Sequence, residues 1–263
     1  MKIGDANPMV LILGGTAEAR ALASSLERSG VAVVTALAGR TSTPRLPHGQ
    51  VRLGGFDGPD GLAAWLAASG VHAVVDATHP FARRISASAQ DACRQVEVPL
   101  LRLERPGWAE QAGDVWYRVG NVGEAAALVG ELGQRAWLTI GRQGVGAFAG
   151  VRTCWFLIRC IQSPDPPLPE HHEIVLDRGP YTVDGELALI DHHRIDVLVT
   201  KESGGAATEA KLEAARARRL PVIVVRRPPT LGVESVSTVS AAADWALSVV
   251  DGGAVRTVRP WSR

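Results

Sequence analysis

The sequence predicts an α/β fold with two parallel sheets, each covered by helices on both faces. Short apolar runs, each ended by a glycine or a polar residue, alternate with stretches rich in Ala and Leu. The runs are continuously apolar, which is typical of parallel strands buried on both faces. The length of 263 residues allows one large or two small domains, since a domain averages about 150 residues. We therefore expect two doubly wound, Rossmann-like domains with a cleft between them.

The first half of the chain carries the clearest alternation. After the first apolar run, the i, i+3, i+4, i+7 spacing of apolar residues predicts a helix that Gly30 ends. Strands are expected at residues 9–13, 31–38, 51–53, 71–75 and 98–103. Helices are expected at residues 19–26, 62–68 and 85–93.

The second half repeats this pattern after an interruption by Pro, Gly and polar residues at 106–113, where we expect the domain boundary. The predicted domains are residues 1–110 and 111–263, and the Pro-rich segment 163–169 is expected to be a loop of the second. Strands are expected at residues 115–119, 137–140, 155–161, 173–176, 197–200 and 222–225. Helices are expected at residues 124–132, 186–192, 208–218 and 241–250.

The composition excludes several classes of protein. A hydrophobic content of 46% and a net charge of +1 argue against disorder and against an overall attraction to nucleic acid or anionic membranes. The apolar run at residues 10–13 is too short for a signal peptide, which needs about 7–15 apolar residues. The 3 cysteines form no CxxC pair and are suited to a reducing compartment. We expect a cytoplasmic, soluble enzyme.

A glycine turn follows the first expected strand. Gly14 and Gly15 allow a tight turn and a close approach to a ligand, and Thr16 can cap the following helix. Amide groups at such a helix start favour an anion such as a diphosphate. The GxGxxG pattern is incomplete, so the turn could also serve the fold alone. Glu18 would repel a phosphate, and it would face a sugar hydroxyl or be neutralised by Arg20.

The second expected strand ends at Gly39, Arg40, Thr41 and Ser42. An acid at this place binds the ribose 2′-hydroxyl of NAD, whereas an arginine suits the 2′-phosphate of NADP. The arginine and the two hydroxyls therefore favour NADPH over NADH. The alternative is a solvated arginine in a polar loop.

Residues 76–82, Asp-Ala-Thr-His-Pro-Phe-Ala, follow a buried strand. Ligands in such sheets bind at the carboxyl ends of the strands, so this cluster predicts a site. Thr78 and His79 are candidate cofactor contacts, and Asp76 and His79 are candidate catalytic residues. In the competing interpretation, Thr78 only caps a helix and His79 is structural.

Three strand ends of the second half carry cations. Arg142 follows one strand, Arg226 another, and Lys201 leads a third strand into Ser203 and Gly204. In a chain of balanced charge, these cations predict a local pocket for a polyanion, and arginine suits carboxylates. Ordinary surface cations are the alternative.

Other motifs point to no chemistry. The histidines near residues 171–173 and 191–193 lack the spacing of zinc motifs, so no metal site is expected. The cysteines have no neighbouring base. A Tyr-x-x-x-Lys pair of sugar or alcohol dehydrogenases is absent, since Asn121 follows Tyr117 and Gly185 follows Tyr181 at four residues.

Four segments together resemble the precorrin-6A reductase family of cobalamin biosynthesis. They are residues 12–18 (Ile-Leu-Gly-Gly-Thr-Ala-Glu), 76–82, 101–106 (Leu-Arg-Leu-Glu-Arg-Pro) and 200–204 (Thr-Lys-Glu-Ser-Gly). The resemblance spans about residues 10–228. The chain departs from the family at Arg178-Gly179-Pro180-Tyr181, where relatives tend to carry Gln-Gly-Pro-Phe.

The resemblance implies an NADPH-dependent reduction of one ring double bond of precorrin-6A, giving precorrin-6B. Hydride passes from the nicotinamide C4 to a ring carbon and a proton to its neighbour. The tetrapyrrole, rich in carboxylates, is the implied partner, held across the cleft and exchanged with other enzymes of the pathway. The implied substrate contacts are Arg105, Arg142, Arg178, Tyr181, Lys201, Ser203, Gly204 and Arg226. Lys201 is also a catalytic candidate.

Two other functions remain open from the sequence. A reductase of the cobalt-containing substrate would carry the same motifs. A nucleotide-binding regulatory module would bind NADPH without oxidising it.

Overall fold

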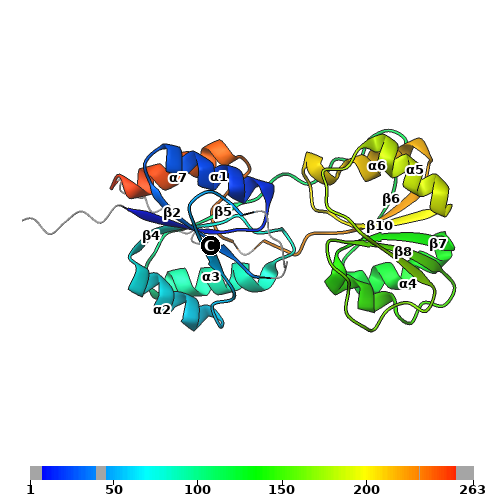
Figure 1. Cartoon of the computed structure of the whole chain (residues 1–263), viewed down its shortest axis with the longest axis horizontal. Helices are drawn as coiled ribbons and strands as arrows, with labels where there is room; N and C mark the ends of the chain where they lie inside the picture. Colours follow the sequence, from blue (N-terminus) through cyan, green and yellow to red (C-terminus); the bar gives the residue numbers. More distant parts are fainter. Residues whose placement is uncertain (1–7, 40–45, 231, 253–263) are drawn as a thin grey trace, which may run out of the picture. The chain divides into compact units, whose positions relative to one another are not determined.

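The computed structural model describes residues 8–39, 46–230 and 232–252. It divides into two compact units (Figure 1). Unit 1 comprises residues 1–105 and 229–263, and unit 2 comprises residues 106–228. Within the described residues, each unit holds one six-stranded sheet whose paired strands are all parallel. This confirms the predicted α/β class with two Rossmann-like halves.

The sheet of unit 1 has the strand order β12-β5-β4-β1-β2-β3. Its strands are β1 (Met9–Leu13), β2 (Ala32–Leu37), β3 (Gln50–Leu53), β4 (Val71–Asp76), β5 (Leu100–Leu103) and β12 (Ser235–Val236). The chain proceeds from β1 toward β3 on one side and from β4 toward β12 on the other. The order therefore reverses between β1 and β4, and ligands of open α/β sheets bind at such a switch point.

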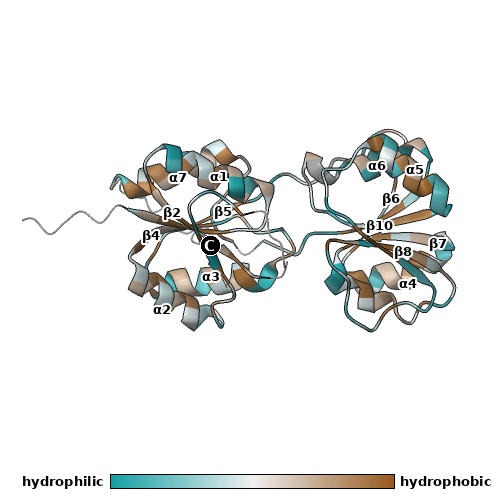
Figure 2. Ribbon diagram, in the orientation of Figure 1, coloured by the Kyte–Doolittle hydropathy of each residue, from teal (hydrophilic) through white to brown (hydrophobic). Residues whose placement is uncertain are grey.

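Helices cover both faces of this sheet (Figure 1). They are α1 (Ala17–Arg28), α2 (Pro59–Ser69), α3 (Arg83–Gln95) and α7 (Val239–Val250). Leu22 and Leu26 of α1 pack with Ala246 of α7 in one buried cluster, and Leu66 of α2 packs with Ala89 of α3 in another. The strands between these helices are the hydrophobic layer of the unit (Figure 2).

Unit 2 has the strand order β6-β11-β10-β7-β8-β9. Its strands are β6 (Val115–Val119), β7 (Arg135–Thr139), β8 (Trp155–Cys160), β9 (His172–Leu176), β10 (Val197–Lys201) and β11 (Pro221–Val225). Its helices are α4 (Val122–Leu132), α5 (Val183–His193) and α6 (Ala210–Ala217), with 3₁₀ turns η1 (Arg142–Phe148) and η2 (Ala206–Thr208). The order reverses between β7 and β10, so their carboxyl ends form the switch point of this unit.

The expected division at residues 110 and 111 needs a correction, because residues from Pro229 onward belong to unit 1. The amide of Arg102 donates to the carbonyl of Glu234 at 2.8 Å, and that of Glu104 donates to the carbonyl of Val236 at 2.9 Å. These bonds add β12 to the edge of the first sheet, and α7 packs on α1. The apolar pattern alone does not reveal that the chain returns to its first sheet.

The remaining expected elements lie close to the observed ones. The helix expected at 208–218 is divided into η2 and α6, and η1 and β12 were not expected. Among the described residues, no helix combines the length and the apolarity needed to cross a bilayer.

Candidate functional site

The turn after β1 requires glycine on packing grounds. The amide of Gly14 donates to the carbonyl of Ala36 at 2.9 Å. A Cβ at Gly14 would lie 2.7 Å from Cγ2 of Thr35, well inside van der Waals contact. Gly15 has φ +116°, a backbone conformation that glycine adopts readily, and no atom of the described residues lies within 4 Å of the place where its Cβ would be. The backbone of this turn is thus held against β2 on one side and open on the other.

Thr16 joins this turn to the next strand end. Its Oγ1 accepts from the amide of Ala19 at 3.1 Å, which caps α1 as expected from the sequence. The same hydroxyl donates to the carbonyl of Ala77 at 2.8 Å. The carboxyl ends of β1 and β4 are therefore fixed to each other at the switch point.

Of the other predicted cofactor contacts, only some are seen to lie near the glycine turn. Arg105 NH1 lies 2.8 Å from Oε2 of Glu18, so Arg105, rather than Arg20, is the arginine seen to pair with that carboxylate. Arg20 lies further along α1. Gly39 follows β2 with φ +66°. Arg40, Thr41 and Ser42 lie outside the described residues.

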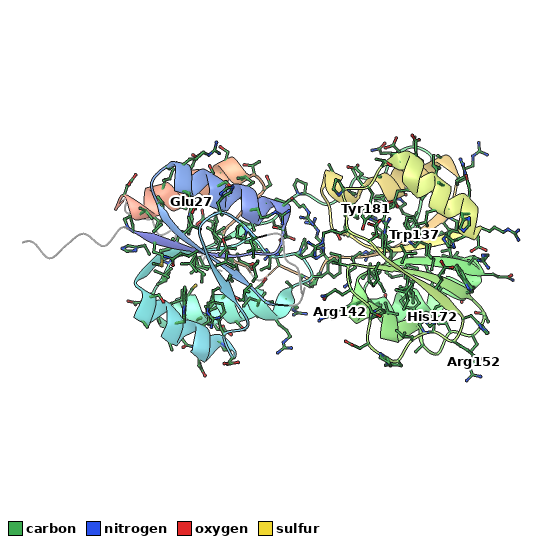
Figure 3. All side chains as sticks on the ribbon, in the orientation of Figure 1. Glu27, Trp137, Arg142, Arg152, His172 and Tyr181 are labelled. Carbon is green, nitrogen blue, oxygen red and sulfur yellow. The ribbon has the colours of Figure 1, made fainter. Side chains whose placement is uncertain are left out.

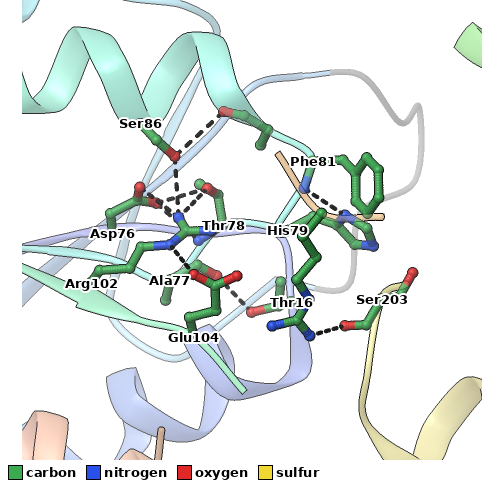
Figure 4. Close-up of polar contacts among 12 residues, drawn as sticks. Thr16, Asp76, Ala77, Thr78, His79, Phe81, Ser86, Arg102, Glu104 and Ser203 are labelled. Atoms are coloured by element: carbon green, nitrogen blue, oxygen red, sulfur yellow. Dashed lines mark hydrogen bonds and ion pairs between the residues drawn. The ribbon is translucent and has the colours of Figure 1, made fainter. Parts of the chain in front are cut away.

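Arg102, which was not predicted as a site residue, organises the end of β4 and the segment that follows it. One guanidinium nitrogen of Arg102 lies 2.6 Å from Oδ2 of Asp76, 3.0 Å from Oγ1 of Thr78 and 3.1 Å from Oγ of Ser86 (Figure 4). Nε of Arg102 lies 3.6 Å from Oε2 of Glu104. Arg102 lies in residues 101–106, one of the segments that resemble the family. That resemblance was the signal in the sequence that could have identified Arg102 as a candidate.

Asp76 is occupied by these contacts. Its Oδ1 accepts from the amide of Thr78 at 3.1 Å and from the hydroxyl of Thr78 at 2.7 Å, while Oδ2 pairs with Arg102. The residue is 2% exposed. A buried carboxylate with its oxygens engaged in this way is suited to fixing the backbone of residues 76–78.

His79 has a defined ring orientation. The amide of Phe81 donates to Nδ1 of His79 at 3.2 Å, and the two ring centroids are 5.8 Å apart. Because Nδ1 accepts this bond, a neutral imidazole carries its proton on Nε2. The ring is therefore arranged as a donor through Nε2.

A small, open hollow lies at this edge of unit 1. It is bordered by the ends of β1, β4 and β5 and by the first turn of α1. The lining residues are Thr16, Glu18, Ala77, Thr78, Pro80, Leu103, Glu104 and Arg105. The switch point of unit 1 is therefore concave.

The cations predicted in unit 2 lie at neighbouring strand ends. Lys201 ends β10 and Arg142 starts the η1 turn just beyond β7, so both belong to the switch point of this sheet (Figure 3 labels Arg142). Arg226 is exposed after β11, the strand on the other side of β10. Burial lowers the pKa of the Lys201 ammonium below its usual range. The arrangement concentrates positive charge on one edge.

The loop after Lys201 is held by the arginine that follows Arg226. Arg227 Nε donates to the carbonyl of Glu202 at 2.9 Å, and its NH2 donates to the carbonyl of Ser203 at 3.1 Å. Gly204 has φ +67°, and its Cβ would lie 2.1 Å from the carbonyl oxygen of Pro106. Only glycine fits this position, so Gly204 shapes the loop as well as being a candidate contact.

Arg178 and Tyr181 follow β9 at the same edge. The Tyr181 hydroxyl donates to the carbonyl of Asp177 at 3.3 Å, and the amide of Arg178 donates to Oδ1 of Asp177 at 2.7 Å. In the sheet order, β8 lies between β9 and β7. Arg178 and Tyr181 extend the row of candidate contacts toward the edge of the sheet.

The remaining histidines and cysteines have structural contacts. His193 stacks on Trp155 with centroids 5.9 Å apart, and its Nδ1 lies 3.6 Å from Oε2 of Glu173. In the part of the chain that the structure describes, no group of three or more His, Cys, Asp or Glu could hold a metal ion. Burial raises the pKa of the Cys93 thiol to about 12, so that thiol is protonated at neutral pH.

The fold and the site together define a Rossmann-like α/β protein with two sheets, each carrying its polar residues at the switch point. The model of the family described as precorrin-6x reductase CbiJ/CobK matches residues 9–247. The chain belongs to this precorrin-6x reductase family, and with it to the oxidoreductases.

Individual relatives agree with this assignment. A precorrin-6A reductase of Rhodococcus erythropolis is 52% identical over 238 residues, covering 90% of this chain and 96% of that protein. The enzyme of the same name from Mycobacterium tuberculosis is 48% identical over 239 residues, with 90% and 96% covered. A solved structure named CobK precorrin-6A reductase superposes with a TM-score of 0.87 at 39% identity, covering 92% of this chain and 97% of that one.

A second group of relatives is more distant. A cobalt-precorrin-6A reductase of Priestia megaterium is 29% identical over 233 residues, covering 84% of this chain and 91% of that protein.

Proposed function

We propose that this protein reduces metal-free precorrin-6A to precorrin-6B with NADPH as the reductant. The observation that carries the proposal is the difference in identity between two groups of relatives. The precorrin-6A reductases are 40–52% identical to this chain. The cobalt-precorrin-6A reductases are 29–30% identical. The higher identity to the first group supports the metal-free substrate.

The cofactor is assigned to the switch point of unit 1. The turn formed by Gly14 and Gly15 leads into α1, whose N-terminal amides and dipole favour the diphosphate. The space beside Gly15 supports this fit, since in the part of the chain that the structure describes no atom lies within 4 Å of the position of its Cβ. NADPH, when bound, supplies a hydride from its nicotinamide C4. The choice of NADPH over NADH rests on Arg40, Thr41 and Ser42 as a prediction from the sequence.

Asp76, which ends β4, and His79, which follows it, take different roles in this proposal. Asp76, held by Arg102 and Thr78, acts as a positioning residue that fixes the segment bearing His79. His79, with its proton on Nε2, orients the nicotinamide by donating a hydrogen bond, and the proton that follows the hydride comes from water. Most of the rate enhancement comes from holding the two reacting carbons close together.

The edge of unit 2 is assigned to the substrate. Lys201 and Arg142 at the switch point, with Arg178 and Arg226 to either side, bind carboxylates of the macrocycle. Lys201 also stabilises charge that develops on the ring during reduction. Ser203 and Gly204 supply hydrogen-bonding groups on the adjoining loop.

An anaerobic assay of NADPH oxidation tests the proposal. The protein is mixed separately with metal-free precorrin-6A and with its cobalt form, and each is tried with NADPH and NADH. We expect fast oxidation only for NADPH with the metal-free substrate, and a product two mass units heavier, since one hydride and one proton are added. Faster turnover of the cobalt form would assign the protein to the other branch. NADPH binding without oxidation of either mixture would indicate a regulatory module.

A further inference from the structure

A buried charged side chain of unit 2 contacts two aromatic rings. Arg159 of β8 is 7% exposed. Its guanidinium carbon lies 4.5 Å from the ring centre of Trp137 and 3.7 Å from that of Tyr181. Its NH1 lies 2.6 Å from Oε1 of Glu186, which is 2% exposed. Figure 3 labels Trp137 and Tyr181 in this unit.

This ion pair is poorly explained by stability alone. Burying two charges costs as much as their attraction returns, so a well-packed apolar pair is often equally stable. In addition, Oε2 of Glu186 and Nε1 of Trp137 are buried without a hydrogen-bond partner among the described protein groups. The cluster therefore points to a role in fixing the conformation of what it contacts.

Tyr181 connects the buried Arg159 to a segment at the carboxyl edge of the sheet. Tyr181 belongs to residues 177–182, the segment that joins β9 to α5. The amide of Asp177 donates to the carbonyl of Cys160 at 2.9 Å, which ties the start of the segment to the strand of Arg159. Thr182 caps α5, whose first turn carries Glu186. Arg159 and Glu186 thus hold the segment through Tyr181 at its centre and through α5 at its end.

We infer that Arg159 and Glu186 are positioning residues for substrate binding, acting through the ring of Tyr181. They fix the segment so that Arg178 faces a carboxylate arm of the macrocycle in one orientation. The inference rests on the proposed function, since it assumes that the edge of unit 2 takes the tetrapyrrole. Its physical basis is the attraction of the guanidinium to the face of an aromatic ring, so the ring of Tyr181 matters more than its hydroxyl.

Substitutions at Tyr181 test this inference in the full-length protein with precorrin-6A and NADPH. Tyr181→Leu removes the ring and should raise KM for precorrin-6A on the order of fivefold to tenfold, the size of one cation–π contact. kcat and the Kd for NADPH should stay within about twofold, since the reacting atoms are not touched. Tyr181→Phe, which keeps the ring, should recover most of the lost affinity.

A double substitution separates positioning from a direct contact. If Tyr181 acts by orienting Arg178, the effects of Tyr181→Leu and Arg178→Met on KM overlap, and the double variant is no worse than the poorer single one. Ile190→Val in the core of α5 is the control for stability, because deleting a buried methylene lowers Tm without reaching the segment. Its KM should equal that of the unmodified protein.

The outcomes distinguish the inference from the function on which it rests. If the unmodified protein does not oxidise NADPH with precorrin-6A, the proposed function fails. If it does, and Tyr181→Leu lowers Tm with KM unchanged, the cluster is structural and the inference is overturned. Additive effects of the Tyr181 and Arg178 substitutions on KM would also overturn it.

Discussion

Lys201 is a candidate substrate contact whose ammonium group has a lowered pKa. It ends β10 at the switch point of unit 2, and burial there lowers the pKa of its ammonium group. An ordinary lysine titrates near 10.4, so Lys201 loses its charge at a lower pH than a solvated one. Because only the charged form binds a carboxylate strongly, this residue sets the alkaline limit of substrate binding in our account.

The prediction for Lys201 concerns pH. KM for precorrin-6A should rise with pH as Lys201 deprotonates, below the pH at which free lysine does so. In Lys201→Arg this rise should move to higher pH, because the guanidinium keeps its charge above a pH of about 12. The measurement is KM for precorrin-6A between about pH 7 and pH 10, made on the unmodified protein and on Lys201→Arg. An identical rise in both would show that another group titrates.

The sign for stability is opposite to that for binding. A lowered pKa in the folded protein means that the unfolded chain binds more protons between the lowered and the ordinary value. The free energy of unfolding therefore increases with pH across that interval. Tighter folding and weaker substrate binding at alkaline pH would both arise from the same side chain.

The places of some candidate site residues at the strand ends were predictable from the sequence, and those of others were not. Gly14, Thr16, Asp76 and Thr78 follow strand ends in the printed order, so their meeting at the switch point follows from the parallel sheet. Arg102 was missed because it lies inside a strand, where an arginine is usually taken as a surface residue. Its role depends on side-chain contacts across the sheet, which spacing along the chain does not encode.

At the level of elements, the β4–α3 segment is fixed by the ion pair between Arg102 and Asp76. The side chains are 13% and 4% exposed. Arg102→Met leaves a buried carboxylate without its counterion and should destabilise the protein by about 3 kcal/mol. In the double variant with Asp76→Asn, the loss should be at least about 1 kcal/mol smaller than the sum of the single losses. Urea unfolding of the four proteins measures both quantities.

The matched control for this cycle is Arg94→Met on the neighbouring helix α3. Arg94 lies 3.6 Å from Asp91, and both side chains are largely exposed, 71% and 52%. Such a surface pair contributes about 0–1 kcal/mol. Strict additivity in the Arg102 and Asp76 cycle, or a loss no larger than that of Arg94→Met, would contradict the fixed segment.

Most helices and strands were predictable because their apolar residues follow a regular pattern along the chain. Continuous apolar runs place the strands to within a few residues, and Thr16, which was expected to cap a helix, stands at the observed start of α1. The two-residue strand β12 was missed because so short a run has no period to detect. The η1 turn was missed because its sequence, rich in glycine, has no helical pattern.

At the scale of the whole molecule, unit 1 is built from two separated parts of the chain. The sequence shows where each sheet begins, but the return of residues 229–252 to the first sheet depends on contacts between β12 and β5 and between α7 and α1. Both units carry candidate polar residues at a switch point, where ligands of such sheets bind. We propose that the cofactor lies at the switch point of unit 1 and the carboxylates of the substrate at that of unit 2.

The central claim is that the protein moves a hydride from the nicotinamide to the macrocycle. The direct measurement uses NADPH carrying deuterium at both C4 positions, metal-free precorrin-6A and the unmodified protein without oxygen, followed by mass analysis of the tetrapyrrole. Our account predicts one deuterium in each product molecule, at a ring carbon, with the second added hydrogen coming from water. Oxidation of the labelled NADPH with no deuterium in the tetrapyrrole would contradict it.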